Sequence, residues 1–366
     1  MSTLITVDLD ALEANYRFCR EQLKPGNCAA VVKADAYGLG IGRIAPSLRH
    51  AGCRQFFTAT HREGITLRAL LPDVEVFVFE GVTEDSLDVF CEHELVPVLI
   101  SPDHAELWAR QARTLGQRLP AVIHIDTGMT RLGFGKPELE QLLERREDLD
   151  AFDLRYVMTH YACADDSDLD KTRQQLERFD SLRKLLPPAP TSVGNSAGGL
   201  LGKPWSGDMA RIGIALFGGN PYLGSAPDLE PVLRIQSRVL QLREVIAGTT
   251  VGYGATHKAD SNTMIATVGT GYADGYPWSL GNCGVASVGG FRVPVVGRVS
   301  MDLITLDVTG VPPELVQPGQ MVDLIGPDVS LEEVAERAGT INYEILTRLS
   351  QRSRRRTSFV SLDIRW

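Results

Sequence analysis

Several polar side chains follow short apolar runs in this chain, and the first of them, Lys33, closes the run at residues 29–33. A lysine at the end of an apolar strand is poorly solvated, which lowers its pKa and frees its amine to form a Schiff base. A lysine in such a place more often lies at a rim with its amine in solvent. Lys33 alone therefore does not decide between the two roles.

Other polar groups follow later apolar runs in the same way. They are residues 126–131, which end in Arg131, then His160 with its neighbours, Asn195 with Ser196, and Arg211. In a barrel enzyme the reacting groups lie at the carboxyl ends of the strands, so we expect these side chains to converge on one mouth. Gly213 and Ile214 offer backbone amides where barrels often bind phosphate, although a glycine there also simply permits a tight turn.

Eight short apolar runs alternate with segments of helical spacing. The runs lie at residues 29–33, 56–59, 75–79, 96–99, 121–125, 154–158, 191–193 and 209–212. Helix-start residues precede several of the helical segments, such as residues 101–103 before a helix at 105–115, and a second helix is expected at 137–146. This alternation predicts an α/β fold, an N-terminal (β/α)8 TIM-type barrel, with a doubly wound open sheet as the alternative.

After about residue 230 the helical segments disappear. Strand-like runs at residues 232–245, 264–268, 285–299 and 303–308 are separated by glycine-rich turns, which predicts a C-terminal, mainly antiparallel β domain. We therefore expect two domains, at residues 1–230 and 231–366. Residues 330–333 (SLEE) predict a capping box that opens a short helix, and residues 342–350 are expected to be helical.

Composition and charge exclude several classes of protein. Hydrophobic residues make up 43% of the 366 residues and charged residues 23%, which is typical of a globular chain. The net charge of -9 disfavours nucleic acid and anionic membranes as partners, and the basic residues Arg352 and 354–356 are expected to form a solvated or dimer-contacting tail. The cysteines form no CxxC pair and the first residues no signal peptide, so we expect a cytoplasmic protein with reduced thiols. The histidines form no HxxxH pair, and no metal site is expected.

Residues 31–38 (VVKADAYG) resemble the segment around the lysine that binds pyridoxal 5'-phosphate (PLP) in the alanine racemase family. Further segments resemble that family in the same order along the chain. They are residues 126–134 (DTGMTRLGF), 159–162 (THYA), 195–197 (NSA), 211–218 (RIGIALFG), 251–256 (VGYGAT), 271–277 (GYADGYP), 297–302 (GRVSMD) and 341–344 (INYE). The resemblance thus spans nearly the whole chain.

The resemblance implies a PLP-dependent isomerase for L- and D-alanine that acts as a head-to-tail homodimer. Lys33 matches the imine-forming lysine, and Tyr253 matches a catalytic residue supplied by the other subunit. Arg131 matches a residue that binds the cofactor's phenolic oxygen or the substrate carboxylate. The other matches are the phosphate-binding positions Tyr37, Ser196, Gly213, Ile214 and Tyr343 with Asn195 beside them, the carboxylate-binding amide of Met301, and Tyr272 at the substrate entrance.

Racemisation requires two acid/base groups on opposite faces of the α carbon, and Lys33 and Tyr253 match those groups. A free tyrosine has a pKa of about 10, so Tyr253 needs a positive environment to act as a base. His160 and Arg211 are expected to provide it. Arg211 also matches the residue that faces the pyridine nitrogen, where a guanidinium keeps its proton and leaves the ring a weak electron sink.

The chain departs from the family pattern at a few positions. Some members carry a carbamylated lysine where this chain has His124, so the support of Arg131 must come from elsewhere. Leu39 and Ser300 replace a frequent histidine and cysteine, and neither change removes a group that the mechanism requires. Residues 351–356 (QRSRRR) replace an ending with proline, which leaves the terminal contacts open.

Three alternatives remain beside a racemase for alanine. A racemase for serine, lysine or a broad range of amino acids would share the fold, and the width of the pocket decides between them. A non-catalytic PLP carrier on the same barrel would lack the β domain expected at residues 231–366. A PLP decarboxylase would lack the combination of Arg211 with residues 300–302. The sequence also leaves open whether the enzyme supplies D-alanine for peptidoglycan precursors or serves alanine catabolism.

Overall fold

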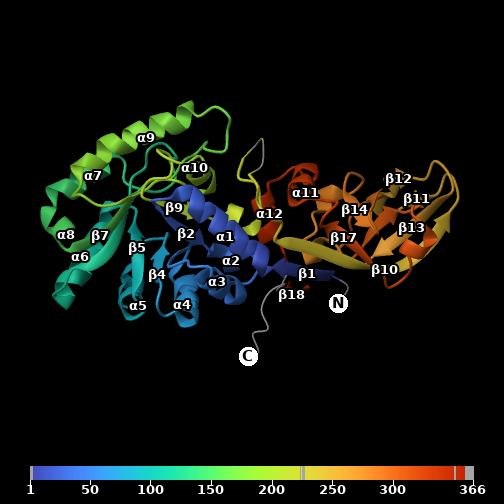
Figure 1. The fold of residues 1–366 in the computed structure, drawn as a ribbon, viewed down its shortest axis with the longest axis horizontal. Helices are drawn as coiled ribbons and strands as arrows, with labels where there is room; N and C mark the ends of the chain where they lie inside the picture. The colour runs from blue at the N-terminus through green and yellow to red at the C-terminus, as the bar shows by residue number, and fades with distance from the viewer. Residues whose placement is uncertain (1–2, 223, 225–226, 350–351, 359–366) are drawn as a thin grey trace.

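The computed structural model describes residues 3–222, 224, 227–349 and 352–358. Its N-terminal part is a nearly closed barrel of parallel strands surrounded by helices, and its C-terminal part is a separate sheet beside the barrel (Figure 1). The two parts share one continuous apolar core. No helix within the described ranges is long and apolar enough to cross a membrane.

The barrel strands pair in the order β8-β7-β6-β5-β4-β3-β2-β9. They are β2 (Asn27–Val31), β3 (Gln55–Thr58), β4 (Glu75–Val78), β5 (Leu95–Leu99), β6 (Leu119–His124), β7 (Phe152–Met158), β8 (Thr191–Ser192) and β9 (Met209–Ile212). The barrel nearly closes between β8 and β9, where the Arg211 amide donates to the Gly194 carbonyl at 2.9 Å. All eight predicted strands form, and the predicted barrel, not the open sheet, is confirmed.

Helices connect the barrel strands and cover their outer face (Figure 1). They are α1 (Leu9–Leu23), α3 (Ile41–His50), α4 (His61–Leu70), α5 (Leu87–Glu92), α6 (Pro102–Leu115), α7 (Lys136–Glu144), α8 (Arg146–Asp150), α9 (Asp170–Leu182) and α10 (Ser196–Leu200), with the short segment α2 (Lys33–Tyr37) after β2. The start of α6 follows its sequence signal, because Ser101 caps the helix by accepting from the His104 amide at 3.3 Å.

The C-terminal sheet is mainly antiparallel, as predicted. Its strands are β10 (Leu233–Val245), β13 (Thr263–Val268), β14 (Val285–Val288), β15 (Phe291–Pro294), β16 (Ile304–Asp307) and β17 (Met321–Ile325), and β11 (Thr250–Val251) pairs separately with β12 (His257–Lys258). The single strand expected at residues 285–299 is instead the β14–β15 hairpin. It turns at Gly289 and Gly290, which have φ of +56° and +88°.

Two short helices follow β17. In α11 (Leu331–Ala338), Ser330 accepts from the Glu333 amide at 3.1 Å. The return bond expected of a capping box is replaced, because the Glu333 carboxylate pairs with Arg337 at 2.8 Å and with Arg292. The other helix, α12 (Asn342–Thr347), is shorter than expected, and Ser350 at the end of the predicted range lies outside the described residues.

Both ends of the chain join the C-terminal sheet. Strand β1 (Thr3–Asp8) pairs with β10 before the chain enters the barrel, and β18 (Arg354–Ser358) pairs with β1. Arg352 forms ion pairs with Asp274 at 2.9 Å and Asp302 at 2.7 Å. The basic run is therefore docked on its own chain and is not a purely solvated tail, while a dimer contact, the other expectation, stays a prediction.

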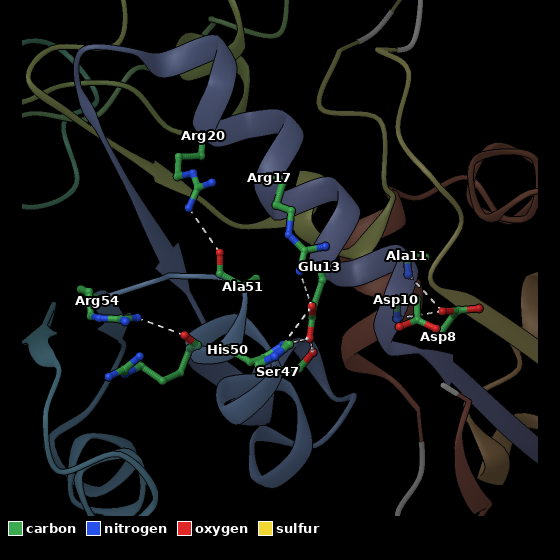
Figure 2. A network of polar contacts seen from close by, with 11 residues as sticks. Asp8, Asp10, Ala11, Glu13, Arg17, Arg20, Ser47, His50, Ala51 and Arg54 are labelled. Carbon is green, nitrogen blue, oxygen red and sulfur yellow. Dashed lines mark hydrogen bonds and ion pairs between the residues drawn. The ribbon is translucent and has the colours of Figure 1, made fainter. Parts of the chain in front are cut away.

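A buried carboxylate joins the first two barrel helices (Figure 2). Glu13 of α1 is 7% exposed and accepts from the Ser47 hydroxyl of α3 at 2.9 Å and from Arg17 at 2.6 Å. His50 Nδ1 lies 3.1 Å from the same carboxylate. A buried carboxylate needs such partners, because an unpaired charge in the interior is strongly destabilising.

We expect Glu13→Ala to lower the free energy of unfolding by about 1–3 kcal/mol, because Ser47 and His50 lose their buried acceptor. Denaturant unfolding followed by circular dichroism measures this change. Glu21→Ala is the control, since Glu21 lies on the same helix and its ion pair with Lys24 is exposed. Equal stability of the two variants would contradict the prediction.

Candidate active site

The chain leaves β2 through a left-handed turn that begins at Lys33. Residues 34–37 all have φ between +53° and +57°, and none of them is glycine. Each costs about 1–2 kcal/mol in this conformation, so the turn forms only where its surroundings hold it. The Gly38 amide closes the turn on the Ala34 carbonyl at 2.7 Å. A Cβ on Gly38 would lie 2.7 Å from the Leu346 carbonyl, so only glycine fits against α12.

The turn presents Lys33 at the barrel mouth. Its amine lies 5.9 Å from the centre of the Phe79 ring, within cation–π range. Desolvation lowers the pKa of Lys33, the charges of Arg131 and Arg211 lower it further, and Glu63 opposes them. A lysine with a lowered pKa has more free amine at neutral pH than an ordinary one.

Arg211 is buried at the end of β9, with 2% of its surface exposed. Its Nη1 donates to the Ser192 carbonyl at 2.7 Å and to the Ser192 hydroxyl at 2.8 Å, and Nη2 donates to the Thr159 carbonyl at 2.7 Å. The third nitrogen, Nε, is buried and has no partner among the described residues. Desolvation lowers the pKa of Arg211 to about 10, below the value above 12 expected from the sequence. Its guanidinium stays charged at neutral pH.

A neutral histidine, His160, lies close to this cation. His160 Nδ1 accepts from Arg211 Nη2 at 3.2 Å, so its proton is on Nε2. Desolvation and then the Arg211 charge lower the pKa of His160 well below its usual range. The positive environment expected from both residues therefore comes from Arg211 alone.

A cradle of donors lies between α2, α10 and α12. The rings of Tyr37 and Tyr343 are 6.1 Å apart, and the Ser196 hydroxyl accepts from the Gly213 amide at 2.9 Å. A Cβ on Gly213 would overlap the Tyr37 hydroxyl, so the backbone approaches that hydroxyl as only glycine can. Burial raises the pKa of Tyr37 and that of Tyr343, the latter to about 12. Both hydroxyls therefore remain donors at neutral pH, as a phosphate site requires.

Two further predicted residues adjoin the cradle. Asn195 caps α10, its side-chain oxygen accepting from the Gly198 amide at 3.0 Å. Ile214 is buried directly after Gly213. Asn195 thus fixes the loop that carries Ser196.

Arg131 lies on a loop organised by one carboxylate. Asp126 accepts from the amides of Gly128, Met129 and Thr130 at 2.9–3.0 Å. The loop bends sharply, with Thr130 at φ +56°. Arg131 is exposed and makes no hydrogen bond to any described residue, although its charge lowers the pKa of Lys33. Its guanidinium is free to bind a carboxylate.

Three predicted site residues are not brought to this mouth. Tyr253, Tyr272 and Met301 are 71%, 41% and 53% exposed on the C-terminal domain. Tyr253 falls between β11 and β12, which lie at one end of the molecule, whereas α2, which begins at Lys33, belongs to the barrel part (Figure 1). Within one chain, Tyr253 and Lys33 therefore do not lie in the same site.

Some residues that build the mouth were not among those predicted from the sequence. Glu63 accepts from the Ala34 amide at 2.7 Å, next to Lys33. Gln175 of α9 donates to the His160 carbonyl at 3.0 Å and so holds the loop after β7. The capping pattern from Thr60 to Glu63 was readable in the sequence, whereas no local signal marked Gln175. Within the described ranges, no cluster of three or more His, Cys, Asp or Glu side chains could hold a metal ion.

Comparison with known proteins gives consistent matches. A family model of the alanine racemase N-terminal domain matches residues 7–221, and one of the C-terminal domain matches residues 232–357. The chain belongs to the alanine racemase family. An alanine racemase of Rhodospirillum rubrum is 47% identical over 357 residues, which cover 97% of this chain and 96% of that protein.

Solved structures of alanine racemases match over nearly the full length. That of Bartonella henselae, with covalently bound pyridoxal phosphate, is 36% identical, with a TM-score of 0.94 over 98% of this chain and 100% of the other. The biosynthetic alanine racemase of Pseudomonas aeruginosa is 33% identical, with a TM-score of 0.91 over 98% and 99% of the two chains.

In this member of the alanine racemase family, a buried imidazole occupies the position where some members carry a carbamylated lysine. His124 is 7% exposed, and its Nε2 has no hydrogen-bond partner in the described part of the chain. Desolvation and the Arg211 charge lower the pKa of His124 to about 3. Arg131 therefore has a neutral neighbour here in place of an anionic carbamate.

The buried His124 predicts a pH-dependent stability. As pH falls below about 6.5, His124 takes up a proton in the unfolded chain but not in the folded one. This residue alone therefore lowers the stability by about 1.4 kcal/mol per pH unit. We expect His124→Gln to lose less stability than the wild type between about pH 6.5 and pH 4. Urea unfolding at several pH values measures both slopes, and parallel curves would refute the prediction.

Proposed function

We propose that the protein is a PLP-dependent alanine racemase whose active sites are each shared by two chains. The observation that carries the proposal is the convergence of Lys33, Arg211 and the donor cradle at one barrel mouth, together with an exposed Tyr253 that its own chain keeps away from that mouth. The family supports the cofactor and the reaction, and the geometry supports the roles of the residues.

The residues present fit PLP. The buried Nε of Arg211 is a donor without a partner and suits the acceptor nitrogen of a pyridine ring. Tyr37, Tyr343, Ser196 and the Ile214 amide would hold the phosphate, beside the α10 loop capped by Asn195. The Gly213 amide, which donates to the Ser196 hydroxyl in this structure, would join them. Lys33, with its lowered pKa, would hold the cofactor covalently.

PLP, when bound, supplies an electron sink that acidifies the α C–H bond of an amino acid. The chain's own residues then decide how the proton moves. Lys33 accepts or delivers it on one face of the α carbon, and Tyr253 of a second chain does so on the other. His160 is neutral and adds no charge here, so Arg211 provides the positive charge that favours the tyrosinate.

The substrate would be held by its carboxylate. Arg131 offers an unpaired guanidinium, and the Met301 amide of the second chain would add a backbone donor. Tyr272 of the second chain would narrow the entrance, so that a small side chain such as that of alanine fits best. We further propose a head-to-tail homodimer, the two domains 1–230 and 231–366, a cytoplasmic location and a supply of D-alanine for peptidoglycan precursors.

The reaction is tested directly with the purified protein. We expect a visible absorption band from PLP bound to Lys33, and loss of optical rotation from L-alanine that exceeds any loss from L-serine or L-lysine. Lys33→Ala should abolish both the band and the activity. A bound cofactor without racemisation of any amino acid would favour the non-catalytic carrier, and equal rates would favour a broad-specificity racemase.

The shared site is tested by mixing two inactive variants. A dimer of one Lys33→Ala chain and one Tyr253→Ala chain contains one intact site and one doubly damaged site. After subunit exchange half of the dimers are mixed, so we expect about a quarter of the wild-type activity to return. Each variant alone should stay inactive. No recovery, with exchange confirmed by mass spectrometry of the intact dimers, would show that each chain forms its own site.

A further inference from the structure

We propose that Glu63 is a positioning residue that holds the left-handed turn after β2 and thereby fixes Lys33 and Tyr37 at its two ends. The proposal deepens the proposed function, because Lys33 and Tyr37 are the residues assigned there to the cofactor. Glu63 itself lies on α4, behind the turn, and is not assigned a contact with substrate or cofactor.

The two oxygens of Glu63 serve different segments. Oε2 accepts from the amides of Ala59 at 2.8 Å and Thr60 at 3.3 Å, and so completes the capping box at the start of α4. Oε1 accepts from the Ala34 amide at 2.7 Å. One carboxylate therefore joins the end of β3 to the first residue of the strained turn.

The Ala34 amide needs an acceptor from outside its own segment. The first amides of any helical turn have no partner within the turn, and here the turn's own bonds begin with the Ala36 amide, which donates to the Val32 carbonyl at 2.9 Å. A hydrogen bond to a carboxylate is stronger than one to a neutral group. Glu63 thus stabilises a conformation that its non-glycine residues disfavour.

Glu63 also acts on the charge of Lys33. The charges that act on the Lys33 amine are those of Arg131, Arg211 and Glu63, and the neighbouring His160 is neutral. Glu63 is the one carboxylate in this set, and it keeps the pKa of Lys33 from falling further. Removal of its charge should therefore lower the pKa of Lys33 further, so that the amine stays unprotonated to lower pH. A shorter side chain at this position should lose the hydrogen bond to Ala34 and destabilise the turn.

The test uses the full-length chain freed of cofactor, with three variants. Glu63→Gln keeps the length but loses the charge, and its NH2 group must face one of the backbone amides. Glu63→Asp keeps the charge and loses the reach to Ala34. Glu80→Gln is the matched control, because Glu80 accepts from the His61 amide at the same helix start and makes no hydrogen bond to the turn among the described residues.

Hydrogen–deuterium exchange of the peptide that contains residues 34–40 measures the stability of the turn. We expect exchange about tenfold to a hundredfold faster in Glu63→Gln and Glu63→Asp, which corresponds to the loss of one charge-assisted hydrogen bond. Glu80→Gln should exchange like the wild type. Wild-type exchange in Glu63→Asp, the variant that best preserves the helix cap, would overturn the proposal.

Acetylation of Lys33 by acetic anhydride is followed by peptide mass spectrometry at several pH values. Its pH dependence measures the pKa of the Lys33 amine. Its midpoint should move to lower pH in Glu63→Gln and stay near the wild-type value in Glu63→Asp and Glu80→Gln. A residue that only supported the fold would leave the midpoint unchanged in all three, and that result would also overturn the proposal. Neither measurement uses PLP or alanine, so an enzyme that racemised nothing would refute the proposed function and leave these results to decide the role of Glu63.

Discussion

The charge of Arg211 is the constraint on which the mouth of the barrel depends. The guanidinium is buried, and no carboxylate pairs with it among the described residues. Carbonyl oxygens at the ends of β7 and β8 compensate it instead, and they are in place only because the barrel nearly closes between β8 and β9. Desolvation lowers the pKa of Lys33, His124 and His160, and the Arg211 charge lowers each of them further. Burial, with this cation as a further cause, thus keeps two imidazoles neutral and favours a free amine at Lys33.

The barrel mouth is completed by the domain beside it. The turn after β2 packs against α12, where the Gly38 backbone contacts Leu346, and α12 also brings Tyr343 to the Tyr37 ring. Arg355 of β18 donates to the Gly38 carbonyl at 2.9 Å. The last described strand of the chain therefore supports the loop that carries Lys33. Cofactor binding at the barrel and folding of the C-terminal sheet are linked through these contacts.

Sequence patterns predicted the structure correctly where neighbouring residues along the chain determine it. A parallel barrel strand is buried on both faces and reads as a continuous apolar run, so all eight were found, and the polar residues that end them mark the mouth. The patterns failed where pairing is distant. Strand β18 consists of basic and hydroxyl residues without an apolar pattern, and it is a strand because β1 lies beside it. The left-handed turn at residues 34–37 opposes local preference, and the Glu63 contact that holds it comes from another helix.

The proposed pair of chains would give a role to Tyr253, which is exposed on the C-terminal domain. Tyr253 is 71% exposed, so its side chain contributes little to the packing of its own domain. Its counterpart, Lys33, lies at a mouth whose own chain offers one proton-transfer group on one side. Because racemisation needs groups on both faces of the α carbon, a chain that keeps Lys33 and Tyr253 apart must either use another base or receive Tyr253 from a partner. His160 and His124 are poor substitutes, since both are neutral and too weakly basic to accept a proton near neutral pH. The burial of both histidines beside Arg211 therefore favours the proposal of a second base supplied by a second chain.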